Sequence, residues 1–379
     1  MSGLCKVRLV GHPYAPIGMG EHVRSTFRAL RSVAVQPKLT DIYKLLPPTT
    51  DELAEFAGAS TDVPADINVF HINGNEVEQV LAHLAHQQPW SGYNIVYPLW
   101  ELAKYPAEWA RQLDRFDEIW APSRFIYDSL LEACTKPVIH MTLACEVVLT
   151  SFLGRRYFGI PEADYTFLFA YDLRSHTSRK NPQAVIKAFE RIVAARPFLK
   201  THLVLKVNGV ETNPAEFHQI KKELESLKGN VTLLNRVMTN NEVKNLVRCC
   251  DCYVSLHRSE GYGFGIAEAM VLGKPVIATA FSGNMDFMGS DVSYGVNYDL
   301  VTLKGRDYPH CHDQVWADPD WEQASTFMAA LIDDPSKGRA IGTRASSHMR
   351  SRFSYRATGL NYLNRLEKIS QLISSYSAS

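Results

Sequence analysis

Short runs of Val, Ile and Leu that alternate with helical patterns most constrain what this 379-residue chain can fold into. Apolar runs without polar alternation are typical of parallel strands that are buried on both faces of a sheet. Alternating strands and helices predict parallel sheets with right-handed crossovers, and two consecutive series predict two doubly wound α/β domains. We expect strands at 7–10, 67–71, 94–97, 118–121, 138–141, 167–170, 202–207, 231–234, 252–256 and 276–279.

The stretch 151–164 separates the two series, because it contains glycines and a proline and shows no clear period. We therefore place the domain boundary near residue 160. One Rossmann-like domain is expected over 1–160 and the other over 161–354.

Two helical patterns of the second half are well marked. The pattern at 182–195 has an apolar stripe on one face, and Asn181 as N-cap followed by Pro182 marks its start. A last pattern, at 355–379, follows the final strand, and its period does not say which domain it packs against.

The charges of the chain cancel, with 40 Lys and Arg against 40 Asp and Glu. This balance argues against a nucleic acid or an anionic membrane as the main partner, because both select for a basic excess. Residues 1–164 carry 14 basic and 19 acidic side chains, whereas residues 165–379 carry 26 and 21. The second half is therefore better suited to an anionic ligand, although solvated surfaces alone can produce such a difference.

Several features predict a soluble cytoplasmic protein. The first residues lack the long apolar region of a secretory signal, and no stretch approaches the length of a spanning helix. The seven cysteines are odd in number and dispersed, which is typical of reduced thiols.

The segment 259–270 is the most informative, because it places glycines and two carboxylates between a strand and a helix. Gly263 and Gly265 allow close approach of the backbone to a ligand, and the amides that begin the helix at Phe264 favour phosphate. Glu260 follows the strand and Glu268 lies about one turn into the helix, so two carboxylates flank a phosphate site. A nucleotide sugar fits this arrangement; the alternative is a glycine-rich turn with Glu268 as a surface charge.

The pattern of Glu260, seven residues and Glu268, continued by Ala-Met, Gly and Pro-Val-Ile up to 279, resembles retaining glycosyltransferase family 4. The resemblance implies the GT-B fold, in which two Rossmann-like domains face each other across a cleft. It also implies that Glu260 contacts the transferred sugar near the reacting carbon and that Glu268 binds the ribose hydroxyls. Ser282-Gly283-Asn284 replaces the Gly-Gly-x-Pro-Glu of many members, so the donor-side loop belongs to a variant branch.

A second segment, 172–182, also resembles the family. The family places an Arg and, six residues later, a Lys on the donor diphosphate, and Arg174 with Lys180 has this spacing. Arg179 competes for the arginine role, because Arg-Lys-Asn-Pro is itself a common form of the motif. Basic residues at a helix start oppose the helix dipole, which favours a ligand over mere solvation.

The first half matches the family more loosely. Gly18 and Gly20 lie in a loop that, by the resemblance, closes over the donor phosphates and the acceptor. Asn73 occupies the position of a family histidine near the transferred sugar, and His71 lies two residues earlier. A packed, satisfied histidine is the alternative for His71.

Trp100 and Glu101, at the end of another strand, resemble the acceptor-binding segments of family members. An aromatic face can stack on a sugar ring, and a carboxylate can bind or deprotonate a hydroxyl. The alternative for Glu101 is a surface carboxylate.

Metal sites are not expected. Cys249 and Cys252 have CxxC spacing without a second pair, His310-Cys311-His312 is interpreted as incidental, and Asp318-Pro319-Asp320 fits a helix start. The resemblance implies metal-independent transfer in which Arg and Lys replace a divalent cation. It implies no cofactor besides the nucleoside-diphosphate-sugar co-substrate.

The sequence thus predicts a retaining transferase that moves a hexose, such as mannose or glucose, from a nucleoside-diphosphate sugar to a glycan or glycolipid hydroxyl, in surface polysaccharide biosynthesis. Membrane contact would be at most peripheral, through a lipid-linked acceptor, and no nucleic acid is involved. The resemblance implies that the helix at 355–379 crosses back onto the first domain.

Other functions on the same fold are a sugar-nucleotide epimerase, a phosphorylase or an inactive sugar-nucleotide-binding protein. A dehydrogenase is disfavoured, because its glycine fingerprint would need Gly at Val23. The base, the sugar, the acceptor and the oligomeric state are left open.

Overall fold

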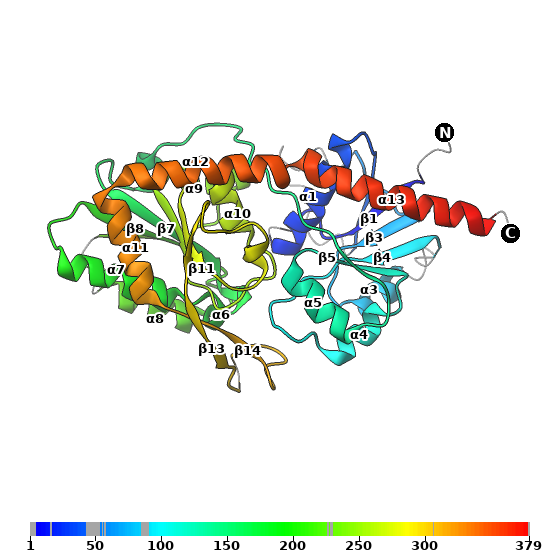
Figure 1. Cartoon of the computed structure of the whole chain (residues 1–379), viewed down its shortest axis with the longest axis horizontal. Coiled ribbons are helices and arrows are strands. Elements are labelled where there is room, and N and C mark those ends of the chain that lie inside the picture. The colour runs from blue at the N-terminus through cyan, green and yellow to red at the C-terminus, as the bar shows by residue number, and fades with distance from the viewer. Residues whose placement is uncertain are drawn as a thin grey trace. The chain divides into compact units, whose positions relative to one another are not determined.

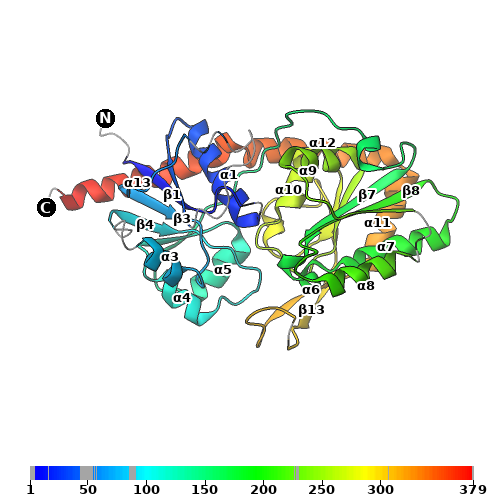
Figure 2. The same cartoon turned by 180° about the vertical axis from the view of Figure 1, so that it is seen from behind.

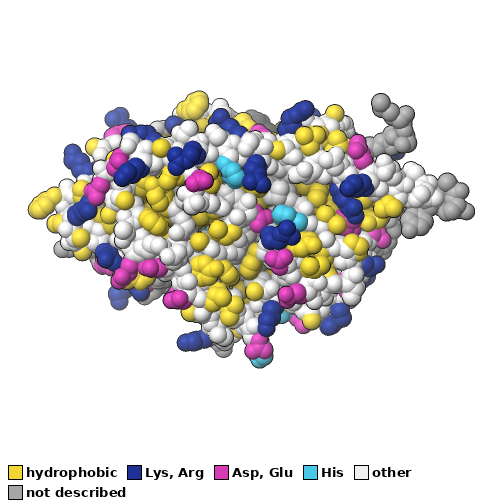
Figure 3. Space-filling model, viewed as in Figure 1, with side chains coloured by type: hydrophobic (Ala, Val, Ile, Leu, Met, Phe, Trp, Pro, Cys, Tyr) yellow, Lys and Arg dark blue, Asp and Glu magenta, His cyan; other side chains and the backbone are white. Residues whose placement is uncertain are grey.

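The computed structural model describes residues 5–15, 17–42, 54, 56, 58–84, 91–225, 227, 230–305 and 307–377. The chain divides into two compact units, one formed by Met1–Cys145 with Ser351–Ser379 and the other by Glu146–Arg350 (Figure 1). Figure 3 shows basic and acidic side chains interspersed over the viewed face, as their equal numbers allow.

A six-stranded parallel sheet in the order β2-β1-β3-β4-β5-β6 forms the centre of the first unit. Its strands are rich in β-branched and aromatic residues and are mostly buried. They are β1 (Val7–Gly11), β2 (Lys38–Asp41), β3 (Ile67–Phe70), β4 (Tyr93–Val96), β5 (Glu118–Ala121) and β6 (Val138–His140). The helices are α1 (Gly18–Ser32), α3 (Val77–Leu84), α4 (Ala107–Leu113), α5 (Arg124–Ala133) and α13 (Tyr355–Ser377).

The C-terminal helix α13 packs against α1 of the first unit (Figure 2). Gly359 lets the two helices approach closely, because a Cβ atom there would collide with Ala29 O. Tyr362 stacks on Trp120 with ring centroids 5.5 Å apart, and Arg365 pairs with the fully buried Glu118. These contacts explain why a helix at the end of the chain belongs to the first unit.

The second unit has a six-stranded parallel sheet in the order β12-β11-β10-β7-β8-β9. Its strands are β7 (Tyr165–Asp172), β8 (Thr201–Asn208), β9 (Val231–Leu234), β10 (Cys252–Ser255), β11 (Val276–Thr279) and β12 (Tyr294–Val296). The antiparallel pair β13 (Tyr298–Thr302) and β14 (Val315–Pro319) is separate from it. The helices are α6 (Thr177–Lys180), α7 (Pro182–Ala195), α8 (Pro214–Glu225), α9 (Asn240–Cys249), α10 (Phe264–Val271), α11 (Trp321–Asp333) and α12 (Pro335–Arg352).

All strands expected from the sequence are present, with ends that differ by at most two residues. The sequence did not indicate β2, β12, β13 and β14. Of these, β2 and β12 are short edge strands and β13 is largely exposed, so they lack the apolar run that marks a buried strand. The helix expected at 182–195 is α7, but Asn181 has a left-handed backbone and its side chain donates to Leu256 O instead of capping the helix.

The segment after Cys145 belongs to the second unit, so the division precedes the boundary expected near 160. Thr150 N and Leu153 N donate to the side-chain amides of Asn241 and Asn245 on α9, at 2.9 and 3.0 Å. The Arg155 guanidinium lies 2.6 Å from Asp251 Oδ2. Because side chains distant in sequence hold this irregular segment, its period could not reveal where it belongs.

Within the part of the chain that the structure describes, no helix combines the length and the apolar character that a membrane crossing requires.

Candidate functional site

Glu260 follows β10 at the carboxyl end of the second sheet and meets two cations that follow β7. Lys180 Nζ donates to Glu260 Oε1, and Arg179 Nη1 lies 3.3 Å from Oε2. Arg179 Nη1 also donates to Ser259 O at 2.8 Å. Glu260 is only 9% exposed, so the carboxylate and both cations form a nearly buried cluster.

The charge of Glu260 is set by these neighbours. Burial by itself raises the pKa of a carboxyl group, but the nearby Lys180 and Arg179 outweigh it and lower the pKa of Glu260 to about 2. The side chain is therefore an anion at neutral pH. It can accept hydrogen bonds from hydroxyl groups or stabilise positive charge, but it cannot act as a general acid.

The loop 282–284 fixes the backbone of Glu260. Glu260 N donates to Ser282 Oγ at 2.8 Å, and Gly283 N donates to Glu260 O at 2.9 Å. A side chain at position 283 would collide with Gly261 O. The segment that departs from the family pattern thus supports the candidate catalytic carboxylate, which the sequence did not show.

His257 lies three residues before Glu260, interacts with it electrostatically and has a defined tautomer. The Asn284 amide donates to Thr279 O at 2.9 Å, so its Oδ1 accepts from His257 Nε2 at 3.0 Å. Nε2 therefore carries the proton, and Ser255 Oγ donates to Nδ1 at 3.0 Å. Burial lowers the pKa of His257, so the cluster contains a neutral imidazole that sequence reasoning had missed.

Glu268 lies on α10 and pairs with Lys244 of α9. Both side chains are buried, at 8% and 6% exposure. Sequence reasoning identified Glu268 but missed Lys244, because a lysine on a helix gives no local sign of a buried partner. The pair holds the second carboxylate in a fixed position next to the glycine loop.

The predicted glycines of this loop have separate structural reasons. Gly263 is the N-cap of α10 with a φ of 94°, which disfavours any residue with a side chain. Gly265 has no room for a Cβ atom, because Tyr253 Oη would lie 2.5 Å away. Phe264 begins α10, where the amide groups of the first turn have no acceptor within the helix and favour an anion.

Arg174 is placed differently from Arg179. It is 45% exposed and forms a bidentate pair with Asp172, with Nε to Oδ1 at 2.9 Å and Nη2 to Oδ2 at 2.8 Å. Gly209 makes room for this pair, because a Cβ atom there would lie 2.6 Å from Asp172 Oδ1. The structure thus joins Arg179 and Lys180 to Glu260, whereas Arg174 lies at the ends of β7 and β8.

In the first unit, Gly18 and Gly20 begin α1. A Cβ atom at Gly20 would collide with Ala15 O, whereas Gly18 has open space. Arg24 closes the loop by donating to Pro13 O at 2.8 Å and to Ala15 O at 3.0 Å. The loop is therefore tightly built, and its contact with donor and acceptor stays a prediction.

Asn73 connects the ends of two strands. Its Oδ1 accepts from Leu99 N at 2.8 Å, and its backbone N donates to Glu76 Oε2 at 2.9 Å. Two residues earlier, His71 is fully buried against His22, with ring centroids 4.6 Å apart. His71 is thus packed inside the unit, as its alternative interpretation held, but within the described part of the chain neither ring nitrogen has a hydrogen-bond partner, so it is not satisfied.

Trp100 is 3% exposed, and its Nε1 donates to Lys104 O at 2.9 Å. Its ring packs edge-on against Trp109 at 5.1 Å and Tyr105 at 5.8 Å. Glu101 is partly exposed. Their roles toward an acceptor stay predictions.

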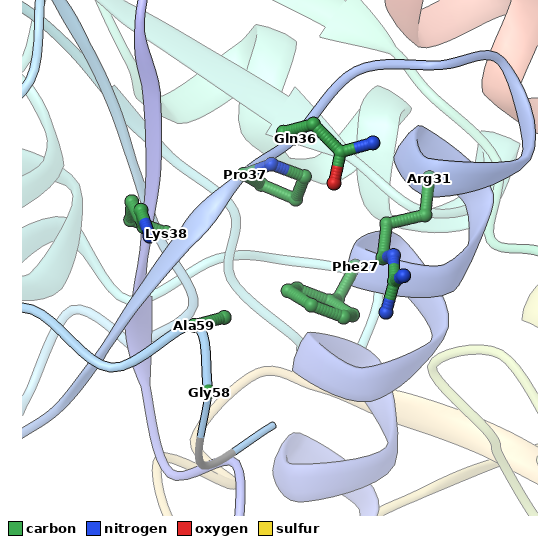
Figure 4. Close-up of a pocket in the computed structure, with 7 residues that line it drawn as sticks. All are labelled: Phe27, Arg31, Gln36, Pro37, Lys38, Gly58 and Ala59. Atoms are coloured by element: carbon green, nitrogen blue, oxygen red, sulfur yellow. The ribbon is translucent and has the colours of Figure 1, made fainter. Parts of the chain in front are cut away.

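A pocket of about 270 Å³ lies elsewhere in the first unit, between α1 and β2 (Figure 4). It is lined by Phe27, Arg31, Gln36, Pro37, Lys38, Gly58 and Ala59. None of the predicted site residues lines it.

Among the described residues, no group of three or more His, Cys, Asp or Glu side chains could hold a metal ion. Cys249 and Cys252 are buried free thiols. Asp320 is the N-cap of α11 and accepts from Gln323 N at 2.9 Å, whereas Asp318 and Pro319 lie in β14.

Residues 155–298, which carry this charged cluster, match the family model of glycosyl transferases group 1. No curated protein sequence matches the chain.

Solved structures are similar to the chain over almost its whole length. Anabaena HepE, crystallised with UDP and glucose, is 13% identical with a TM-score of 0.72, and the match covers 96% of this chain and 100% of that one. A sucrose-phosphate synthase from Thermosynechococcus elongatus is 15% identical with a TM-score of 0.68, covering 98% and 100%. A glycosyltransferase from Rickettsia africae is 13% identical with a TM-score of 0.67, covering 96% and 98%. The expectation of a GT-B fold is confirmed.

Proposed function

We propose that the protein is a retaining, metal-independent glycosyltransferase that transfers a hexose from a nucleoside-diphosphate sugar to a hydroxyl group of a glycan or glycolipid. The observation that carries the proposal is the ionised Glu260 paired with Lys180 and Arg179, inside the segment that matches the family model. A buried carboxylate beside two cations suits a ligand that is neutral at one end and anionic at the other.

The cations act on the leaving group. As the bond between sugar and phosphate breaks, negative charge builds on the diphosphate, and preorganised cations stabilise it. Lys180 and Arg179, which both pair with Glu260, provide these cations, and the amide groups at the start of α10 add hydrogen-bond donors. Arg174, beside Gly209, supplies a further cation from the ends of β7 and β8.

The two carboxylates act on the sugars of the donor. Glu260 accepts hydrogen bonds from the hexose and stabilises positive charge at the reacting carbon. Glu268, held by Lys244, accepts from the ribose hydroxyls. HepE has been crystallised with UDP, with UDP-glucose and with UDP plus glucose, so UDP-sugars are the first donors to test.

The first unit binds the acceptor. Gly18 and Gly20 close over donor and acceptor, Asn73 lies near the transferred sugar, and Glu101 with Trp100 binds the acceptor hydroxyl group. We place the reaction in the cytoplasm and in surface polysaccharide biosynthesis, with peripheral membrane contact through a lipid-linked acceptor at most.

The test is a panel of UDP-, GDP- and ADP-sugars, scored for donor hydrolysis and for a shift in melting temperature, with and without EDTA. We expect the sugar nucleotides of one base to raise the melting temperature. We also expect slow hydrolysis that releases the sugar with retained anomeric configuration, and EDTA should not change the rate. Activity that requires free phosphate would indicate a phosphorylase, and an epimerised donor an epimerase. Binding without turnover, with acceptors supplied, would indicate an inactive binding protein. Each of these three outcomes contradicts the proposal.

A further inference from the structure

The β13–β14 hairpin lies outside the parallel sheet of the second unit and reaches the turn that carries the two cations. Figures 1 and 2 show the hairpin beside α6, which spans Thr177–Lys180.

Tyr308, in the loop of this hairpin, touches two residues of the turn. Its ring lies 4.7 Å from the His176 ring in an edge arrangement, and the Arg179 guanidinium carbon lies 5.8 Å from its centroid. Next to it, Asp307 O accepts from Ser178 Oγ at 2.7 Å. The loop therefore contacts three residues of the segment 176–179.

Arg258 joins the same turn to β14. Its Nη1 donates to Ser178 O at 2.8 Å, and its Nη2 lies 3.1 Å from Asp318 Oδ1. Its backbone N donates to Arg179 O at 2.8 Å, and its guanidinium carbon lies 5.4 Å from the Trp316 ring centroid. The hairpin is thus anchored to the turn at both of its ends.

The backbone of the turn also needs such support. His176 has a φ of 62° and a ψ of 107°, a conformation that costs free energy for a residue with a side chain. Such conformations persist only where the surroundings fix them, and they are common at functional sites. The Tyr308 ring packs against His176 at this position.

We propose that Tyr308 is a positioning residue for the donor diphosphate, and this rests on the proposed function. Its ring attracts the Arg179 cation and restricts the rotamers of a long, flexible side chain. Arg179 is thereby held where it meets Glu260 and the diphosphate. Removal of the ring releases Arg179, so donor affinity falls, whereas the tyrosine hydroxyl group is not required.

The experiment compares Tyr308→Leu and Tyr308→Phe in the full chain, with UDP, GDP and ADP as probes in calorimetric titrations. For the diphosphate that the wild type binds, we expect the Kd of Tyr308→Leu to rise about three- to tenfold, which lies within the range of a cation–π contact. Tyr308→Phe should stay within about twofold of the wild type, because the ring is kept. Leu300→Ser, on the exposed face of β13, is the matched control and should leave Kd unchanged.

A double-mutant cycle separates positioning from general stability. In an Arg179→Ala background, Tyr308→Leu should cause no further loss of affinity, because its target is gone. If Tyr308→Leu does not fold, Ser178→Ala removes one contact of the hairpin with the turn and should raise Kd about twofold, as a neutral hydrogen bond does.

An unchanged Kd in Tyr308→Leu, or in Ser178→Ala if that variant is needed, would overturn the proposal. So would equal losses in Tyr308→Leu and Tyr308→Phe, or fully additive losses with Arg179→Ala. A wild type that binds a diphosphate but transfers no sugar would contradict the proposed function alone. A wild type that binds none of the three would overturn both.

Discussion

Both units contain a six-stranded parallel sheet, but the second unit has buried ion pairs near the carboxyl ends of its strands, whereas the first has a packed cluster of neutral rings beside the ends of β3 and β4. In the second unit, Glu260 pairs with Arg179 and Lys180, and Glu268 pairs with Lys244. At the corresponding edge of the first unit lie His71 and Tyr97, with His22 of α1 packed against both rings. The same sheet architecture therefore supports either an anion site or a neutral, packed edge, and the side chains at the strand ends decide which.

Burial of two histidines at this neutral edge costs free energy. His22 and His71 are fully buried, and within the described part of the chain their ring nitrogens have no hydrogen-bond partner. Burial lowers the pKa of His71 to about 3 and holds the pKa of His22 well below its usual value, helped by the neighbouring His71. Both rings are therefore neutral at physiological pH, whereas Glu260 of the second unit is ionised and paired with Lys180 and Arg179.

Of the substitutions that test this contrast, loss of the Glu260 charge should have the largest effect on activity. In Glu260→Gln, we expect kcat for transfer to fall by about 10²- to 10³-fold, as when one preorganised charge-stabilising group is lost. Affinity for the nucleoside diphosphate should persist or increase, because Arg179 and Lys180 lose their anionic partner. Steady-state kinetics and titration measure both. Glu322→Gln, on the surface of α11, is the control, and unchanged turnover in Glu260→Gln would disprove the catalytic role.

Removal of the cations should have the next largest effect, and it should differ between Arg174 and Arg179. Arg179→Ala and Lys180→Ala should each lower kcat/KM by about 10- to 100-fold, as expected of charge-assisted contacts to phosphate. Arg174→Ala should have a smaller effect, because Arg174 is 45% exposed and paired with Asp172. Donor kinetics for the three variants, made alongside each other, provide the measurement. A larger loss in Arg174→Ala than in Arg179→Ala would contradict the grouping of Arg179 with Glu260.

Substitution of Glu268 should have a smaller effect, on the affinity for the ribose hydroxyl groups of the nucleotide. The wild type should bind UDP about tenfold more tightly than 2′-deoxy-UDP, because one charge-assisted hydrogen bond is lost. In Glu268→Gln this preference should shrink to about twofold. Lys244→Met tests the pair separately: it removes the lysine partner of a buried carboxylate and should lower stability by about 3–5 kcal/mol. An undiminished preference for UDP in Glu268→Gln would argue against ribose binding.

The smallest expected effect is on the pH dependence of folding stability, which tests the burial of His71 at the neutral edge. The unfolded chain binds a proton at His71 below about pH 6.5, whereas the folded chain does not until about pH 3, so stability falls as the pH falls through this interval. The slope contributed by His71 reaches about 1.4 kcal/mol per pH unit where the unfolded chain is protonated at this residue and the folded chain is not, between about pH 3 and pH 6.5.

Urea unfolding of the wild type and His71→Phe between pH 5 and pH 7.5 measures this slope. Compared with the wild type, the variant should show a slope shallower by up to about 1.4 kcal/mol per pH unit near pH 5, and the difference should vanish as the pH rises above about 6.5. Glu260 does not interfere, because its stabilising charge is lost only below about pH 4.5, toward its lowered pKa of about 2. Equal slopes in the two proteins would show that His71 is not held neutral by burial.

Much of the fold could be predicted because its signals are local. Buried strands such as β5 and β11 appear as apolar runs with the bounds that the structure shows, and α7 has a clear stripe and a proline at its start. The spacing of Glu260 and Glu268 with the intervening glycines is local as well. The edge strands β2 and β12 and the β13–β14 hairpin lacked such a signal, because their exposed positions interrupt the apolar pattern.

The sequence by itself determined two parallel α/β series, the glycine loop and the two carboxylates, since these depend on hydrophobic period and backbone geometry along the chain. The tertiary structure decided the partners: Lys180 and Glu260 are 80 residues apart, and Lys244 reaches Glu268 from another helix. It also placed the segment after Cys145 and the helix α13 in their units, and the hairpin beside Arg179. Ion pairs, ring contacts and burial join side chains through space, so no pattern along the chain specifies them.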